Sequence, residues 1–184
     1  MTYMGEVLAR HGSDKSTNHS YDPIYESLFP DRDAVKNVLE IGIASGQSVL
    51  AWREIFPQAQ IVGFDKMPCH GPKVGSTDSS IYPQRPRPER LEIHLGEMSD
   101  YSALMRAVGG RKFDMIIEDA SHKLDDNLRT LFWLWPYVIE GGYYVVEEME
   151  NAHSWVECLP LFKGVEIRRT TGAHPDEILV VIKK

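Results

Sequence analysis

Residues 38–46 read Val-Leu-Glu-Ile-Gly-Ile-Ala-Ser-Gly, and this segment carries the clearest fold signal in the chain. The apolar run over residues 38–41 is typical of a buried strand. The glycines that follow allow a sharp turn into a helix that we expect over residues 47–56, which Pro57 ends. A strand, a glycine loop and a helix in this order predict one unit of an open sheet with a ligand crevice beyond the strand.

The same alternation of strand and helix continues along the chain. Apolar runs predict strands over residues 61–64, 91–94, 113–117, 143–146 and 178–182, and helical spacing predicts helices over residues 100–108 and 125–137. The expected fold class is therefore α/β, with a doubly wound, mostly parallel, Rossmann-like sheet that carries helices on both faces.

We expect residues 1–184 to form a single domain. Residues 1–36 predict an N-terminal helical cover, in which a polar stretch over residues 12–19 separates a short helix from a second helix near residues 21–29. Residues 66–90 contain five prolines and no periodicity, and irregular segments this long are usually functional or disordered. We interpret that segment as a lid or an insertion loop.

Composition restricts the classes of partner. The chain has 184 residues, 42% hydrophobic and 26% charged, and its net charge of −7 argues against a nucleic-acid binder, which needs a basic face. No apolar run is long enough to span a membrane and no secretory h-region begins the sequence, so we expect a cytoplasmic protein without a membrane partner. The two cysteines, Cys69 and Cys158, indicate neither a disulfide framework nor a zinc site.

The glycine loop and the second strand together indicate a nucleoside ligand. Asp65 ends that strand, where a carboxylate can accept hydrogen bonds from both hydroxyls of a ribose. Ala44 stands where the second glycine of a dinucleotide fingerprint belongs, which disfavours a pyrophosphate and hence a nicotinamide-dependent oxidoreductase. A nucleoside without a diphosphate points to S-adenosylmethionine, and the alternative is a tight turn with no ligand.

Acidic residues follow two later strands. Residues 118–122 read Glu-Asp-Ala-Ser-His and end the fourth strand, whereas Glu147 and Glu148 end the fifth. If these strands are neighbours, Asp119, Glu147 and Glu148 face one crevice and offer the oxygen ligands that Mg²⁺ or Mn²⁺ prefers. His122 is then a candidate general base for a hydroxyl, with Lys123 as the alternative base. Helix caps and solvated charges are the alternative explanation of the acids.

Several motifs together carry a resemblance to a known family. The glycine loop with Asp65 resembles the first motif of class I S-adenosylmethionine-dependent methyltransferases. Residues 118–122 and 146–149 resemble the D-D-G-S-H and I-E-D motifs of the metal-dependent macrolide sugar O-methyltransferases, the mycinamicin and macrocin group. Residues 12–15 with 19–21, 52–57 and 96–100 are similar to that group's G-[ST]-D-K…H-x-Y, M-W-[RK]-x-[FY]-F-P and G-D-Q-S-D segments.

This resemblance implies a set of site residues. It implies that Asp119, Glu147 and Glu148 bind magnesium and that His122 is the base. It also implies cofactor-binding positions at Ser13, Lys15, Glu40, Gly42, Ser45, Gly46, Asp65, Glu97, Met98, Ser99 and Asp119. The chain departs from the group's motifs by Ala120 in place of glycine and by Glu118 and Glu148 in place of aspartates.

The leading hypothesis is an S-adenosylmethionine- and divalent-metal-dependent O-methyltransferase that acts on a hydroxyl of a small molecule, a natural-product sugar. One alternative is a metal-independent methyltransferase whose acids bind the acceptor directly. Another is a cofactor-binding module without turnover. The acceptor, the choice between Mg²⁺ and Mn²⁺ and a homo-oligomeric state stay open at this point.

Overall fold

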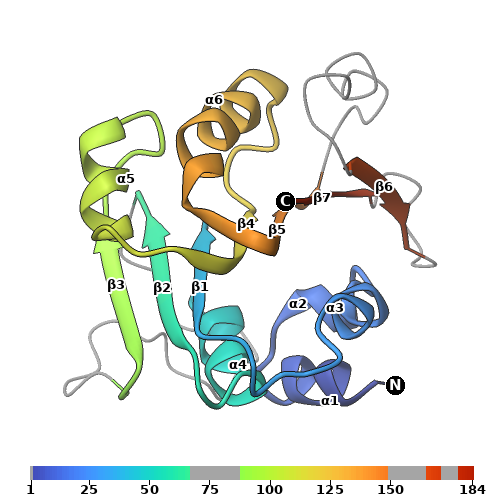
Figure 1. Cartoon of the computed structure of the whole chain (residues 1–184). Helices are drawn as coiled ribbons and strands as arrows, with labels where there is room; N and C mark the ends of the chain where they lie inside the picture. The colour runs from blue at the N-terminus through green and yellow to red at the C-terminus, as the bar shows by residue number, and fades with distance from the viewer. Residues whose placement is uncertain (1, 67–87, 149–164, 171–177) are drawn as a thin grey trace.

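The sheet has seven strands in the order β3-β2-β1-β4-β5-β7-β6 in the computed structural model, which describes residues 2–66, 88–148, 165–170 and 178–184 (Figure 1). The strands are β1 (Asn37–Ile41), β2 (Gln60–Asp65), β3 (Leu91–Leu95), β4 (Phe113–Glu118), β5 (Val138–Val146), β6 (Val165–Arg169) and β7 (Ile178–Lys183). Strands β1 to β5 pair in parallel, and β7 and β6 add an antiparallel edge.

Helices cover both faces of this sheet. They are α1 (Tyr3–Arg10), α2 (Asp14–Thr17), α3 (Asp22–Leu28), α4 (Gln47–Ile55), α5 (Tyr101–Val108) and α6 (Leu124–Leu134), followed by the short 3₁₀ helix η1 (Trp135–Tyr137). Successive residues of a strand point to opposite faces. Accordingly, Val38 of β1 joins a core with α1, α3 and α4, and Leu39 joins a second core with α5 and α6. The predicted doubly wound fold is confirmed.

The strand order reverses beside β1, and this reversal positions the site. Ile41 at the end of β1 lies opposite Glu118 at the end of β4, and Glu118 lies opposite Val146 at the end of β5. The residues that follow these three strand ends therefore meet at one edge of the sheet. Ligands of open α/β sheets bind at such a switch point.

Two elements are absent from the sequence-based expectation, and β5 begins at Val138 rather than at residue 143. Helix α2 forms inside the polar stretch 12–19, because the Ser13 side chain accepts a hydrogen bond from the backbone N–H of Lys15 and caps a single turn. Strand β6 was not expected, since its residues have no continuous apolar run; it forms by pairing with β7 along the sheet edge.

The interpretation of the proline-rich segment as a lid or an insertion loop stays a prediction, because residues 67–87 lie outside the described residues. The expectation that residues 1–184 form a single domain also stays a prediction. Among the residues that the structure describes, no helix has both the length and the apolar character needed to cross a membrane.

Candidate functional site

A pocket of about 560 Å³ opens beyond the carboxyl ends of β1, β2 and β4. This volume falls within the roughly 300–1,000 Å³ of small-molecule sites in proteins. Most of the predicted cofactor positions line it, namely Ser13, Lys15, Gly42, Ser45, Asp65, Glu97, Met98, Ser99 and Asp119. Glu40 and Gly46 are not part of its lining. His122, Lys123 and Glu148 also line the pocket.

Gly42 allows the ends of β1 and β4 to touch. Its φ angle is +83°, in the left-handed region that favours glycine. A Cβ atom at this position would overlap the backbone carbonyl of Asp119 and lie 2.8 Å from the Cα atom of Ala120. The backbone N–H of Asp119 donates to the carbonyl of Ile41 at 2.8 Å. The glycine loop therefore fixes where Asp119 enters the pocket.

Asp65 ties the end of β2 to the same loop. Its Oδ2 atom accepts hydrogen bonds from the backbone N–H groups of Ile43 at 2.9 Å and of Ala44 at 3.0 Å. The carboxylate thus lies in the pocket wall beside the glycine loop, where the sequence placed a ribose-binding acid.

Lys15 of α2 lies among three carboxylates. Its Nζ atom is 2.7 Å from Asp119 Oδ2 and 3.2 Å from Glu40 Oε1, and it also pairs with Glu147 Oε2. Only 3% of the Lys15 side chain is exposed. Burial alone would lower the pKa of Lys15, but the three carboxylates outweigh burial and raise that pKa well above its usual value. The ammonium is therefore held in its charged form.

Glu147 faces the N-terminal helices rather than the pocket. Its second oxygen, Oε1, accepts a hydrogen bond from the Tyr25 hydroxyl of α3. Burial raises the pKa of Glu147 well above its usual value, while the Lys15 ammonium opposes that rise. The structure thus gives this predicted metal ligand two partners from residues 15–25.

Glu40 is held in a similar way by the scaffold. Its Oε2 accepts a hydrogen bond from Trp52 Nε1 of α4 at 3.0 Å, and its side chain is fully buried. Burial raises the pKa of Glu40, with the Lys15 ammonium acting against it.

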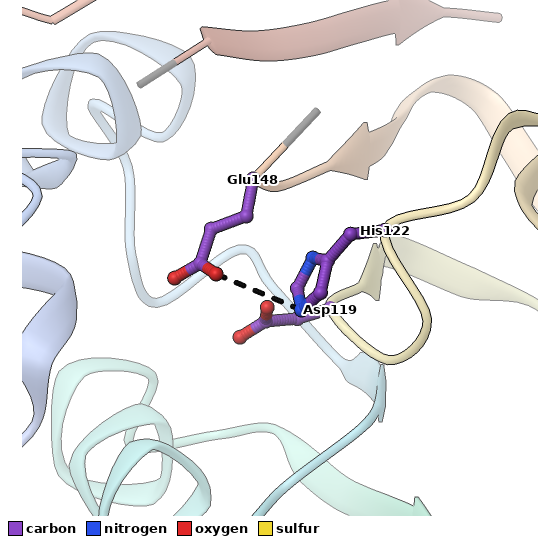
Figure 2. A group of neighbouring side chains, drawn as sticks. All are labelled: Asp119, His122 and Glu148. Atoms are coloured by element: carbon purple, nitrogen blue, oxygen red, sulfur yellow. Dashed lines mark ion pairs between the residues drawn. The ribbon is translucent and has the colours of Figure 1, made fainter. Parts of the chain in front are cut away.

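Three other side chains point toward one another in the pocket, those of Asp119, His122 and Glu148 (Figure 2). One donor atom from each of the three lies within 4.8 Å of the other two, and His122 Nε2 is 3.6 Å from Glu148 Oε2. His122 and Glu148 both have positive φ angles, of +59° and +52°. Such conformations are costly for residues other than glycine and concentrate at functional sites. From these positions both side chains extend toward Asp119 (Figure 2).

The donor chemistry of this group fits a divalent cation. Two carboxylates and an imidazole are ligands that Mn²⁺ and other first-row dications accept, and Mg²⁺ favours the carboxylates. The group is also rich in acids: Glu40, Asp119 and Glu147 lie around the ammonium of Lys15, and Glu148 lies close to Asp119. Two of the three predicted metal ligands, Asp119 and Glu148, thus lie close together. His122 lies nearer to them than the third predicted ligand, Glu147.

Glu118 lies beneath the site and is almost fully buried. Burial raises the pKa of Glu118 to about 8, against a hydrogen bond that the backbone N–H of Ala120 donates to Oε1 at 3.2 Å. At neutral pH this carboxyl group is therefore mostly protonated and adds little to the negative charge above it.

Two residues of the site carried no role in the sequence analysis. His19 follows α2, and its Nε2 atom lies 3.0 Å from Glu148 Oε1; it belongs to the H-x-Y segment, which was noted without a function. Tyr25 lies on a helix with no motif, so nothing in the sequence could have indicated its contact with Glu147.

Comparison with known proteins shows the family to which the chain belongs. A family model described as a methyltransferase domain matches residues 39–149, which run from the glycine loop to the acids after β5. The chain belongs to this family of methyltransferase domains. The resemblance that the motifs indicated is therefore confirmed at the level of the family.

Curated relatives of this methyltransferase domain are longer proteins. The chain is 31% identical to the 8-demethyl-8-(2-methoxy-alpha-L-rhamnosyl)-tetracenomycin-C 3'-O-methyltransferase of Streptomyces olivaceus, over 92% of this chain and 41% of that protein. It is 33% identical to the mycinamicin VI 2''-O-methyltransferase of Micromonospora griseorubida, over 88% of this chain and 38% of that protein. The methyltransferase domain described here therefore spans well under half the length of these relatives.

Solved structures share the fold. The MycE methyltransferase of mycinamycin biosynthesis, in complex with Mg and SAH, superposes with a TM-score of 0.73 at 22% identity, over 100% of this chain and 55% of that one. A Staphylococcus aureus protein described as a caffeoyl-CoA O-methyltransferase superposes with a TM-score of 0.61 at 16% identity, over 100% of this chain and 93% of that one. The class I methyltransferase fold is thereby shown.

Proposed function

We propose that this domain is an S-adenosylmethionine- and divalent-cation-dependent O-methyltransferase for a sugar hydroxyl of a natural product. The observation that carries the proposal is one shared pocket, in which the glycine loop and Asp65 face Asp119, His122 and Glu148. The relatives support the proposal, because they are O-methyltransferases of a rhamnosyl tetracenomycin and of mycinamicin VI. The MycE structures that share the fold hold Mg and SAH.

The cofactor half of the pocket suits a nucleoside. In the proposed arrangement Asp65 binds the ribose hydroxyls, and residues 97–99 lie beside the adenine. Gly42 lets the backbone of Asp119 come close to the glycine loop, because a Cβ atom at this position would overlap the Asp119 carbonyl. Lys15 also lines the pocket, but its ammonium is directed at carboxylates. We therefore assign Lys15 to the carboxylates rather than to direct contact with the cofactor.

The acidic half of the pocket suits the acceptor. Asp119 and Glu148 would hold the cation, and His122 would take the proton of the acceptor hydroxyl at Nε2. When bound, S-adenosylmethionine supplies the methyl group and a divalent cation lowers the pKa of the hydroxyl. The acceptor oxygen forms a bond to the methyl carbon as the bond from that carbon to sulfur breaks. Most of the catalysis then comes from holding two substrates in line.

Removal of metal tests the proposed reaction. The protein is stripped with a chelator, dialysed and assayed for methyl transfer to rhamnosylated and macrolide acceptors, with and without added Mg²⁺ or Mn²⁺. We expect turnover to disappear on stripping and to return with either ion. Undiminished turnover without metal would support the metal-independent alternative. Tight binding of S-adenosylhomocysteine without turnover of any acceptor would support the binding-module alternative.

The position of His122 favours a second candidate role as well. Its imidazole belongs to the group of three converging donors, so it could be a third ligand, with Lys123 as the base. The variant His122→Asn distinguishes the two roles, because asparagine tolerates the left-handed backbone but cannot act as a base. If His122 is the base, its replacement lowers kcat by about 10²–10⁴ and leaves the Mn²⁺ affinity unchanged. A weakened Mn²⁺ affinity in calorimetry would instead assign His122 to the ion.

A further inference from the structure

The carboxylate of Glu148 has a different neighbour at each of its two oxygens. Oε1 lies 3.0 Å from His19 Nε2, and Oε2 lies 3.6 Å from His122 Nε2. Figure 2 shows that the Oε1 side of the carboxylate points away from His122, while the dashed line joins Oε2 to the imidazole. Because Oε1 is already bonded to His19, Oε2 is the oxygen directed at the converging group.

The local backbone fixes the direction of the His19 ring. The backbone N–H of His19 donates to the carbonyl of Asp14 at 3.1 Å, and that of Tyr21 donates to the carbonyl of Lys15 at 2.8 Å. Ser20 between them has a φ angle of +55°, so the chain reverses sharply there. The His19 ring also stacks on Tyr21, with centroids 5.2 Å apart and an interplanar angle of 18°.

Lys15 contacts Asp119 as His19 contacts Glu148, through one oxygen of the carboxylate. Its ammonium holds Asp119 Oδ2 at 2.7 Å, which leaves the other oxygen of that carboxylate for a ligand. Lys15 and His19 both come from the N-terminal segment 13–21. The two carboxylates that they contact follow strands of the sheet. The N-terminal segment thus contacts each carboxylate through one oxygen.

We propose that His19 is a positioning residue, which orients Glu148 through Oε1 so that Oε2 is presented to the divalent cation. The inference rests on the proposed function, since it takes Glu148 as a ligand. Carboxylates that bind metals are commonly hydrogen-bonded by outer partners, and loss of such a partner costs about 10- to 100-fold in metal affinity or activity. His19 would therefore set ion affinity without touching the cofactor.

Two variants of His19 separate its hydrogen bond from its shape. His19→Phe keeps a ring that can stack on Tyr21 but removes the donor to Glu148. His19→Gln returns an N–H group near the Nε2 position. The matched control is His11→Phe, because His11 follows α1, pairs with Glu54 at 2.8 Å and does not line the pocket.

Calorimetry measures Mn²⁺ binding and S-adenosylhomocysteine binding to the chelator-treated protein. We expect His19→Phe to weaken Mn²⁺ binding about 10- to 100-fold. Binding of S-adenosylhomocysteine should not change, and His19→Gln should regain most of the Mn²⁺ affinity. His11→Phe should match the parent protein in both titrations.

Asp119→Asn separates failure of this inference from failure of the proposed function. If Asp119→Asn loses Mn²⁺ but His19→Phe binds it like the parent, the role of His19 is overturned and the metal site stands. If His19→Gln is as weak as His19→Phe, the hydrogen bond is not the cause and the inference also fails. If the parent protein binds no Mn²⁺, or Asp119→Asn binds it unchanged, the proposed metal site falls together with the inference.

Discussion

Replacing Gly42 by alanine is expected to abolish binding of S-adenosylhomocysteine and to destabilise the fold by roughly 2–4 kcal/mol. The estimate combines the cost of a left-handed backbone for a non-glycine residue with that of overpacking. The added Cβ atom would overlap the carbonyl of Asp119, so either β1 or β4 has to move at its end. That movement displaces Asp119 from the pocket. Chemical denaturation and calorimetry measure the two effects.

Gly141 offers a matched control for this prediction. Its φ angle is +80°, close to that of Gly42, but a Cβ atom there would meet nothing within 4 Å. Gly141→Ala therefore carries the conformational cost without the overlap, and it should bind the ligand normally. Equal unfolding free energies for the two variants, with ligand binding retained in both, would show that the close approach at Gly42 does not matter.

Replacing Lys15 by methionine should cost about 3–5 kcal/mol of stability at neutral pH, which is typical when one partner of a buried ion pair is removed. Glu40 and Glu147 would remain buried after losing the ammonium that pairs with both of them. The loss should depend on pH. Burial raises the pKa of both glutamates in the folded state, so they release their protons more readily when the chain unfolds. Folding is thus favoured at low pH and weakens as the pH rises above the unfolded value.

Denaturation of Lys15→Met and of the parent protein at pH 5 and pH 8 measures this effect. The difference in unfolding free energy should be larger at pH 8, and the double variant Lys15→Met, Glu147→Gln should recover part of it. Lys36→Met removes an exposed lysine and should stay within about 0.5 kcal/mol of the parent. A loss that is the same at both pH values, or no loss at all, would contradict the charge network.

The sequence was sufficient for the parts of the site that local patterns encode. The apolar runs predicted β1 to β5, and the glycine loop predicted where they would form a crevice. Because β4 and β5 are parallel neighbours, the acids that follow them were expected at one edge of the sheet, and they lie there. The position of these acids at one edge, as distinct from the direction of each side chain, needed no information beyond strand ends and their order.

The assignment of Glu147 depended on information that no local pattern holds. Neighbouring residues at a strand end face opposite directions, so which glutamate enters the pocket depends on what packs behind it. Here Lys15 and Tyr25 pack behind it, 132 and 122 positions away in the sequence. The positive φ of Glu148 is likewise a feature that no local pattern in the sequence indicates.

In the proposed reaction a divalent cation and the methyl group of the cofactor share one crevice. The most direct measurement is the nuclear magnetic resonance of S-adenosylmethionine with a ¹³C-labelled methyl group, bound to the protein and titrated with Mn²⁺. We expect strong paramagnetic broadening of the methyl signal, and loss of that broadening in Asp119→Asn with the cofactor still bound. A sharp methyl signal when both the cofactor and Mn²⁺ are bound to the unaltered protein would contradict the proposed reaction.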